Sequence, residues 1–236
     1  VLYITLEMAE ERIAERIDAN LLDVTMEDLH DMPQSLYDGK IKKLREKTQG
    51  QLIIKEYPTA SAHSGHFKSL INELALKKSF KPDVIFIDYL NICASARFKG
   101  GNISSYFYIK AIAEELRGLA VEANVPIFSA TQTTRTGFVS TDLGLEDTSE
   151  SFGLPATADF MFALMSNEEL EKLGQMKVKQ LKNRYNDPSV NRAFIIGVDR
   201  SKMRLYDVQQ SSQNIVDANQ VEQKEDAYNK FSDFKL

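Results

Sequence analysis

Hydrophobic and polar positions follow two alternating patterns over the first 150 residues of the chain. Four short apolar runs predict buried strands, at residues 1–6, 51–57, 83–87 and 125–130. Between them, apolar residues recur every three or four positions and predict amphipathic helices over 9–22, 40–47, 67–74 and 105–124. Because strands and helices alternate, the pattern predicts an α/β fold with a mainly parallel sheet flanked by helices.

Turn-forming and polar residues mark the expected boundaries between these elements. Pro33, Asp38 and Gly39 interrupt the helical pattern, so the short charged helix is expected to begin only at residue 40. His63 and His66 precede the apolar positions of the next helix, and we interpret both as loop residues.

The second part of the chain changes to consecutive strands. The pattern predicts a strand at 159–165, a short acidic helix at 167–174, and strands at 176–184, 192–198 and 203–208 joined by tight turns. This order favours an antiparallel extension at one edge of the parallel sheet. Residues 1–208 are therefore expected to form one domain. The stretch 209–236, rich in Gln, Asn, Ser and Asp, is expected to be a polar, flexible tail.

Composition narrows the class of protein. The 236 residues are 43% hydrophobic, which is ample for a core, and the single cysteine excludes an internal disulfide framework. No apolar run approaches the roughly 20 residues that a membrane-spanning helix needs. The net charge of −5 argues against a protein covered in positive charge, but it leaves room for local basic loops.

Polar residues stand at the ends of three predicted strands. Glu7 follows the first strand, Asp88 ends the strand 83–87, and Gln132 follows the strand 125–130. Each alone is weak evidence, because carboxylates often begin helices and polar residues often end strands. Parallel strands bring their carboxyl ends to one edge of a sheet, where a carboxylate can organise Mg²⁺ and another can polarise a water molecule.

Basic residues form a second group. Lys182 and Arg184 alternate along a predicted strand, so both should point to one face and suit a pair that stabilises phosphate. Arg97, Lys99 and Arg135 lie in glycine-containing loops, where they could grip a phosphate backbone. A solvated sheet face and plain surface loops are the alternative interpretations.

A phosphate-binding loop of the G-x-x-x-x-G-K-[ST] type is absent. In the nearest similar stretch, 64–69, the glycine and the lysine are separated and follow no clear strand. The chain also opens inside an apolar run without a methionine. We therefore expect a fragment of a longer protein, with the first strand and the phosphate loop encoded upstream.

Four segments in order, 2–8, 83–90, 129–135 and 182–184, resemble the RecA-like motor domain of hexameric replicative DNA helicases of the DnaB type. The likeness covers residues 1–208 and is greatest to the replicative helicases of T-even-like tailed phages. Three further segments carry that closer likeness: 8–20, 110–117 and 153–160.

The resemblance implies a role for each matched residue. Glu7 corresponds to the catalytic glutamate and Asp88 to the Walker B aspartate that holds Mg²⁺ indirectly. Gln132 corresponds to the glutamine that couples nucleotide state to the DNA-binding loops. Lys182 and Arg184 correspond to the pair that reaches the γ-phosphate of a neighbouring subunit, with Arg184 as the arginine finger.

The resemblance also implies cofactors and partners. ATP and Mg²⁺ are the expected cofactors, and the loops 97–105 and 133–148 would face single-stranded DNA in the channel of a homo-hexamer. A primase and a helicase loader are expected partners. No membrane is involved, and a phage-encoded protein would act in the cytoplasm of its host.

Two alternatives remain open at this stage: a RecA-like recombinase or regulatory ATPase, and a catalytically inactive RecA-like scaffold module. Without the backbone nest and lysine of the phosphate loop, nucleotide affinity should collapse. We predict that the 236-residue chain itself neither hydrolyses ATP nor unwinds DNA. One face of its sheet is expected to be uncovered, which should promote self-association.

Overall fold

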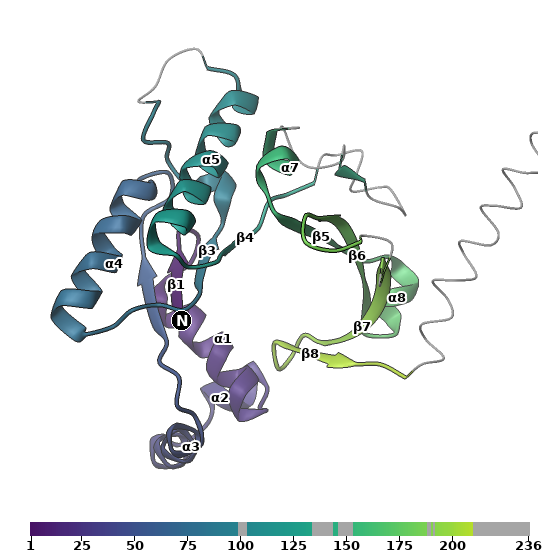
Figure 1. The fold of residues 1–236 in the computed structure, drawn as a ribbon. Coiled ribbons are helices and arrows are strands. Elements are labelled where there is room, and N and C mark those ends of the chain that lie inside the picture. Colours follow the sequence, from purple (N-terminus) through teal and green to yellow (C-terminus); the bar gives the residue numbers. More distant parts are fainter. Residues whose placement is uncertain (99–102, 134–143, 146–152, 188–189, 191, 210–236) are drawn as a thin grey trace, which may run out of the picture. The chain divides into compact units, whose positions relative to one another are not determined.

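The computed structural model describes residues 1–98, 103–133, 144–145, 153–187, 190 and 192–209, which fall into two compact units. The first unit comprises Val1–Asp159 together with Ser201–Met203, and the second comprises the rest of the chain (Figure 1). Lys99, Arg135 and residues 210–236 of the expected tail lie outside the described residues.

The first unit contains the predicted parallel sheet. Its strands are β1 (Leu2–Thr5), β2 (Ile53–Glu56), β3 (Ile85–Asp88) and β4 (Ile127–Ser129), in the order β2-β1-β3-β4. All three neighbouring pairs are parallel, which confirms the prediction. Thr5 lies opposite Asp88, and Ile87 lies opposite Ser129, so the carboxyl ends of the three neighbouring strands β1, β3 and β4 are level with one another.

Two helices cover one face of this sheet. α4 (Ser64–Lys78) and α5 (Ser105–Ala123) lie side by side against it (Figure 1). The buried core consists of side chains that these helices and the strands share, among them Leu2, Ile4, Ile85, Ile87, Phe67, Leu70, Leu74, Ile109, Ile112 and Leu116. The alternation of strand side chains explains why every second strand residue joins this core.

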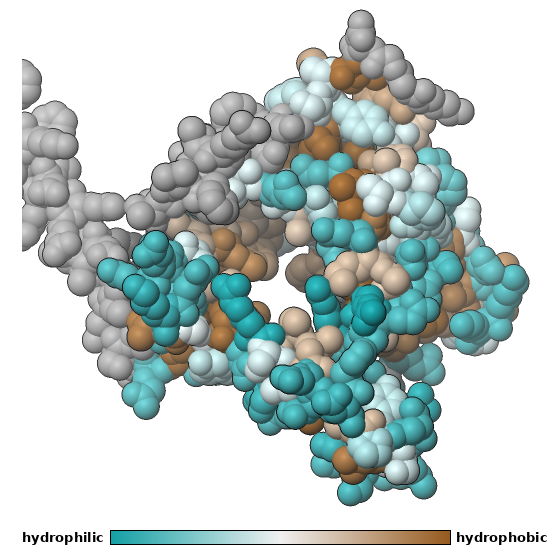
Figure 2. Space-filling model, turned by 180° about the vertical axis from the view of Figure 1, so that it is seen from behind, coloured by the Kyte–Doolittle hydropathy of each residue, from teal (hydrophilic) through white to brown (hydrophobic). Residues whose placement is uncertain are grey.

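The opposite face carries a row of aromatic rings. Tyr3 stacks on Phe86 with ring centroids 6.1 Å apart, and Phe86 stacks on Phe128 at 5.2 Å. Phe86 is 37% exposed and Phe128 47% exposed, so this part of the sheet is uncovered, as expected. Other large apolar side chains are exposed elsewhere, and Figure 2 shows hydrophobic residues scattered among hydrophilic ones on the side that it presents.

The segment between β1 and β2 differs from the prediction. It forms α1 (Glu10–Leu22), α2 (Met26–His30) and α3 (Gln34–Lys47), so the expected helix start at residue 40 is wrong. Pro33 is the residue that precedes the first helical position, where its fixed φ suits a helix start. Asp38 and Gly39 lie inside α3; a glycine there costs about 1 kcal/mol relative to alanine, which a helix of 14 residues tolerates.

The interpretation of His66 as a loop residue was also wrong, because it lies in the first turn of α4. His63 lies just before the helix, as its N-cap. The Gly65 amide donates to His63 Nδ1 at 3.0 Å, and the His63 amide donates to His66 Nδ1 at 3.2 Å. Residues 64–69 are thus helical and do not form a phosphate loop. The separated glycine and lysine in this stretch had indicated the same.

The second unit is an antiparallel sheet of four strands, β5 (Phe160–Met165), β6 (Gln175–Asn183), β7 (Ala193–Asp199) and β8 (Arg204–Asp207). The short helix α8 (Glu168–Lys172) joins β5 to β6. These strands were predicted, but they form a sheet of their own where an extension of the parallel sheet was expected. Hairpin pairing of consecutive strands explains the antiparallel order.

Candidate site at the carboxyl edge of the parallel sheet

Three predicted site residues meet at the carboxyl edge of the parallel sheet. Asp88 is the last residue of β3, and its carbonyl oxygen accepts a hydrogen bond from the Leu6 amide at 2.9 Å. Glu7 follows directly and is exposed. Gln132 lies three residues beyond β4, which pairs with β3. The register of three adjacent strands therefore brings these side chains to one edge.

Asp88 is held by a tyrosine of the neighbouring strand. The hydroxyl of Tyr3 donates to Asp88 Oδ2 at 2.8 Å. Tyr3 lies opposite Phe86, two residues before Asp88, so both side chains point to the same face of the sheet. Burial raises the pKa of Tyr3 well above its ordinary value, and the hydrogen bond to Asp88 raises it further. Tyr3 therefore stays protonated and acts as a donor at neutral pH.

Gln132 is connected to the residue that follows Asp88. Its Nε2 donates to the hydroxyl of Tyr89 at 3.0 Å, and the Leu90 amide donates to the carbonyl oxygen of Ala130 at 3.3 Å. Here η1 (Leu90–Ile92) begins, so the segments after β3 and β4 run side by side. One side-chain and one backbone hydrogen bond thus join the segment that carries Gln132 to the segment that follows Asp88.

Within the described part of the chain, two buried oxygen atoms near this edge have no hydrogen-bond partner. They are Asn91 Oδ1, in η1, and Thr131 Oγ1, next to Gln132. A buried polar atom without a hydrogen bond is costly, so each is a site where water or a ligand atom would be favoured.

The turn that presents Glu7 is stabilised by Thr5, which is fully buried. Thr5 Oγ1 donates to the carbonyl oxygen of Met8 at 2.8 Å and accepts from the Met8 amide at 3.0 Å. The Glu7 amide also donates to Thr5 Oγ1, at 3.4 Å. These bonds end β1 and direct the chain into α1, which leaves the Glu7 side chain at the sheet edge.

The carboxylate of Asp88 at this edge fits Mg²⁺ that is bound together with a phosphate group. Among the described residues, no group of three or more His, Cys, Asp or Glu side chains forms a metal cage. Mg²⁺ usually keeps several water molecules and takes only one or two carboxylates plus phosphate oxygens. A single aspartate at a strand end, with one oxygen occupied by Tyr3, is compatible with that mode of binding.

The two predicted phosphate-stabilising cations lie in the second unit. Lys182 is in β6, whereas Arg184 lies one residue beyond the end of this strand. The register of β5 and β6 shifts between Met161 and Phe162, opposite Lys182. Asn183 Oδ1 accepts from the amides of residues 185 and 186, at 3.0 and 3.1 Å, and forms a turn. Lys182 and Arg184 were predicted to alternate within one strand. This is wrong for Arg184, which lies just outside β6.

Of the predicted DNA-binding residues, only Arg97 is described. It lies in the loop before α5, and its Nη1 forms an ion pair with Glu114 Oε2. The adjacent Glu115 accepts from Ser95 Oγ at 2.6 Å and from the Ala96 amide at 2.9 Å.

Sequence reasoning missed Tyr3, Tyr89 and Glu115, because their partners are far away in the sequence and no local pattern indicates them.

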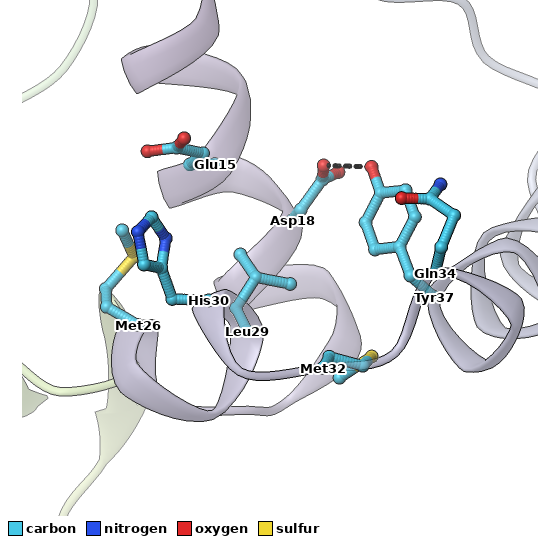
Figure 3. Close-up of a pocket in the computed structure, with 8 residues that line it drawn as sticks. All are labelled: Glu15, Asp18, Met26, Leu29, His30, Met32, Gln34 and Tyr37. Atoms are coloured by element: carbon cyan, nitrogen blue, oxygen red, sulfur yellow. Dashed lines mark hydrogen bonds between the residues drawn. The ribbon is translucent and has the colours of Figure 1, made fainter.

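A pocket of about 240 Å³ lies between α1, α2 and α3 (Figure 3). On the wall of this pocket, the hydroxyl of Tyr37 donates to Asp18 Oδ2 at 2.7 Å. This hydrogen bond and, to a smaller extent, burial raise the pKa of Tyr37 to about 12. None of the predicted site residues lines this pocket, so it takes no part in the site at the sheet edge.

Every helix among the described residues is too short or too polar to cross a lipid bilayer.

Known proteins share much of this chain's sequence. Residues 1–201 match the family model of the DnaB-like helicase C-terminal domain. A DnaB-like replicative helicase of Enterobacteria phage T4 is 47% identical over 215 residues, which are 90% of this chain and 45% of that protein. A probable plasmid replicative DNA helicase of Chlamydia trachomatis is 34% identical over 135 residues, which are 56% of this chain and 28% of that protein. The chain thus spans less than half the length of these relatives.

Solved structures share the fold. An ATPase domain superposes with a TM-score of 0.71 at 18% identity, over 89% of this chain and 75% of that one. A DnaB-like replicative helicase, solved in a study of its interactions with primase, superposes with a TM-score of 0.69 at 18% identity. That match covers 88% of this chain and 50% of the helicase.

Proposed function

This chain belongs to the family of DnaB-like helicase C-terminal domains, and we propose that it is the motor core of an ATP-dependent replicative DNA helicase. The complete protein would translocate along single-stranded DNA as a hexameric ring and separate the strands of a duplex during replication of the phage type. Family membership favours this function over a recombinase or an inactive scaffold.

One observation carries the proposal. Glu7, Asp88 and Gln132 stand at the carboxyl ends of three adjacent parallel strands, which is where open α/β sheets bind ligands. Two carboxylates and an amide at one edge suit a reaction in which water attacks a phosphoryl group. A sheet serving only as a scaffold has no need for this combination.

Each residue has a distinct role in the proposed reaction. Asp88, oriented by Tyr3, would hold Mg²⁺ through water, and the ion would neutralise charge on the phosphates of ATP. Glu7, exposed at the same edge, would polarise the attacking water. Gln132 would respond to the γ-phosphate and transmit its presence through Tyr89.

Lys182 and Arg184 would act between subunits. An arginine supplied by a neighbour stabilises negative charge in the transition state of phosphoryl transfer. In a homo-hexamer, Arg184 would take that role at the ATP of the adjacent subunit, with Lys182 beside it. The turn built on Asn183 presents Arg184 at the end of β6, which supports this assignment.

Basic loops would contact DNA. Arg97, with Lys99 and Arg135, would bind phosphates of the single strand in the ring channel. A primase and a helicase loader are the proposed protein partners, and the complete protein would act in the cytoplasm of the host cell.

The test is ATP hydrolysis stimulated by single-stranded DNA, in a chain extended upstream through the expected phosphate loop. We expect DNA-dependent turnover, and a loss of about 10³-fold on Arg184→Ala. Mixed rings of Arg184→Ala subunits and Glu7→Gln subunits should regain part of the activity that each variant lacks alone, because a Glu7→Gln subunit can lend its Arg184 to a neighbour that keeps Glu7. Nucleotide binding without any turnover in the extended wild type would contradict the proposal.

A further inference from the structure

Two adjacent glutamates of α5 reach the segment that leads into the proposed DNA-binding loop. Glu114 and Glu115 both contact residues 95–97, although they leave the helix in different directions. This segment begins three residues after η1 and therefore connects the nucleotide edge of the sheet to Arg97.

Glu115 fixes the backbone of this segment. Its carboxylate accepts from Ser95 Oγ at 2.6 Å, from the amides of Ala96 and Arg97 at 2.9 and 3.3 Å, and from Ser64 Oγ at 3.2 Å. Burial of this carboxyl group opposes ionisation, but the four hydrogen bonds hold the pKa of Glu115 below its ordinary value. The root of the loop is thus bound to an acceptor that is charged at neutral pH.

Ser95 is the centre of the arrangement. Only 5% of it is exposed, and its amide donates to the hydroxyl of Tyr108, another residue of α5, at 3.1 Å. The preceding Ala94 amide donates to the carbonyl oxygen of Ala62 at 2.8 Å. Since α5 and the segment before α4 both hold it, the backbone up to Arg97 has a defined position relative to the core.

Glu114 acts on the side chain of Arg97. Its Oε2 pairs with Arg97 Nη1, while its Oε1 lies 3.9 Å from Lys110 Nζ. The pair is at the surface, with 51% of the Arg97 side chain and 37% of the Glu114 side chain exposed. Exposed pairs contribute little stability, so another anion of suitable geometry can replace the carboxylate. Guanidinium binds carboxylate and phosphate with the same fork of donors.

We propose that Glu114 is an internal competitor of nucleic-acid phosphate for Arg97, on a loop root that Glu115 holds in place. The inference rests on the proposed function, because it assumes that Arg97 contacts single-stranded DNA. A phosphate displaces Glu114 from Arg97, and the carboxylate keeps its contact with Lys110, 3.9 Å away. Glu115 is a positioning residue, since it acts on Arg97 only through the backbone.

The experiment measures binding of a fluorescent oligodeoxythymidylate to the 236-residue chain by anisotropy at low salt. We expect Glu114→Gln to tighten binding about two- to fivefold, the range that an exposed ion pair allows. Arg97→Ala should weaken binding, and Glu114→Gln should have no effect in the Arg97→Ala background. Glu122→Gln is the matched control, because Glu122 is an ion-paired glutamate on the same helix that contacts Lys68.

If Glu114→Gln tightens binding equally in the wild-type and Arg97→Ala backgrounds, or if Glu122→Gln tightens it as much, the cause is a general charge effect. Either result would overturn this inference and leave the proposed function standing. Absence of binding by both the wild type and Glu114→Gln would overturn the proposed DNA contact and the inference with it.

For Glu115, hydrogen exchange provides the readout. Glu115→Gln should speed exchange of the amides of residues 96 and 97, and Glu114→Gln should leave it unchanged.

Discussion

At the scale of single residues, the site depends on contacts between side chains of neighbouring strands. Asp88 takes part in one such contact with Tyr3, and Gln132 in another with Tyr89. The residue types at 7, 88 and 132 could be identified from the sequence, because each follows an apolar run. Their partners could not, because Tyr3 and Asp88 are 85 positions apart and only the strand register brings them together.

Removal of the Tyr3 hydroxyl tests the orientation of Asp88. Tyr3→Phe keeps the ring in its stack with Phe86 but leaves Asp88 Oδ2 without its donor. In a chain extended to include the phosphate loop, we expect the Mg²⁺ concentration for half-maximal ATP hydrolysis to rise about threefold to tenfold. Tyr57→Phe is the control, because Tyr57 packs edge-on against Phe67 in the core. An unchanged Mg²⁺ requirement would show that Tyr3 does not position Asp88.

The charge of Glu115 predicts a pH dependence of stability. Its pKa is lowered in the folded state, so its contribution is present above the unfolded value of 4.5 and is lost as pH falls through the folded pKa. Glu115→Gln should reduce the free energy of unfolding by about 1 kcal/mol at pH 7, after allowance for solvent screening. Denaturant unfolding at several pH values should show the difference shrinking below pH 4.5. A difference that stays constant down to pH 3 would contradict this linkage.

At the scale of elements, the residue just before a helix marks its start. Pro33 is the N-cap of α3 and makes no side-chain hydrogen bond there, whereas His63, the N-cap of α4, accepts one from the Gly65 amide. Sequence patterns located both helices but misplaced the start of α3, because Pro33, Asp38 and Gly39 were taken as breakers, whereas Pro33 directly precedes the helix and the other two lie inside it. Histidine is an uncommon N-cap, so its role at α4 became visible only from the hydrogen bond to the Gly65 amide.

The cap of α4 can be tested by substitution. His63→Ala removes the acceptor for the Gly65 amide and should lower the free energy of unfolding by about 1 kcal/mol. The corresponding fall in Tm, measured by circular dichroism, is about 2 to 4 °C for a chain of this size. His63→Asn should restore most of the loss, since asparagine is a favoured N-cap. Equal losses in the alanine and asparagine variants would argue against capping as the role of His63.

At the scale of the whole molecule, the parallel sheet is covered by α4 and α5 on one face, whereas Phe86 and Phe128 are exposed on the other. Apolar patches of this kind mark surfaces that other protein segments cover. The parallel order followed from the alternation of strands and helices, and the antiparallel strands from the run of consecutive strands. Their division into two separate sheets did not, because hydropathy reports which faces are buried and not which strands pair.

The exposed aromatic row predicts self-association of the 236-residue chain. Phe128→Gln should lower the weight-average mass measured by analytical ultracentrifugation at micromolar concentration, because it interrupts the row of stacked rings. Leu76→Gln is the control, since Leu76 is 85% exposed on α4 and lies outside this row. A similar decrease in both variants would indicate non-specific association.

The same chain is predicted to lack ATP hydrolysis and unwinding, because the described edge offers carboxylates and an amide but no nest of amides for phosphate. Release of phosphate by the purified chain should stay at the background of a Glu7→Gln variant. Turnover above that background, lost in the variant, would contradict the prediction.

The sequence by itself determined the class of fold, the order of the strands along the chain and the three polar residues that follow them. These features depend on local periodicity, which short-range sterics and side-chain burial set within each segment. Only the tertiary structure decided that β1 lies between β2 and β3, that Tyr3 holds Asp88, and that Glu114 and Glu115 hold the segment at Arg97. Such contacts join residues far apart in the chain, so they depend on how the elements pack and not on the pattern within any one of them.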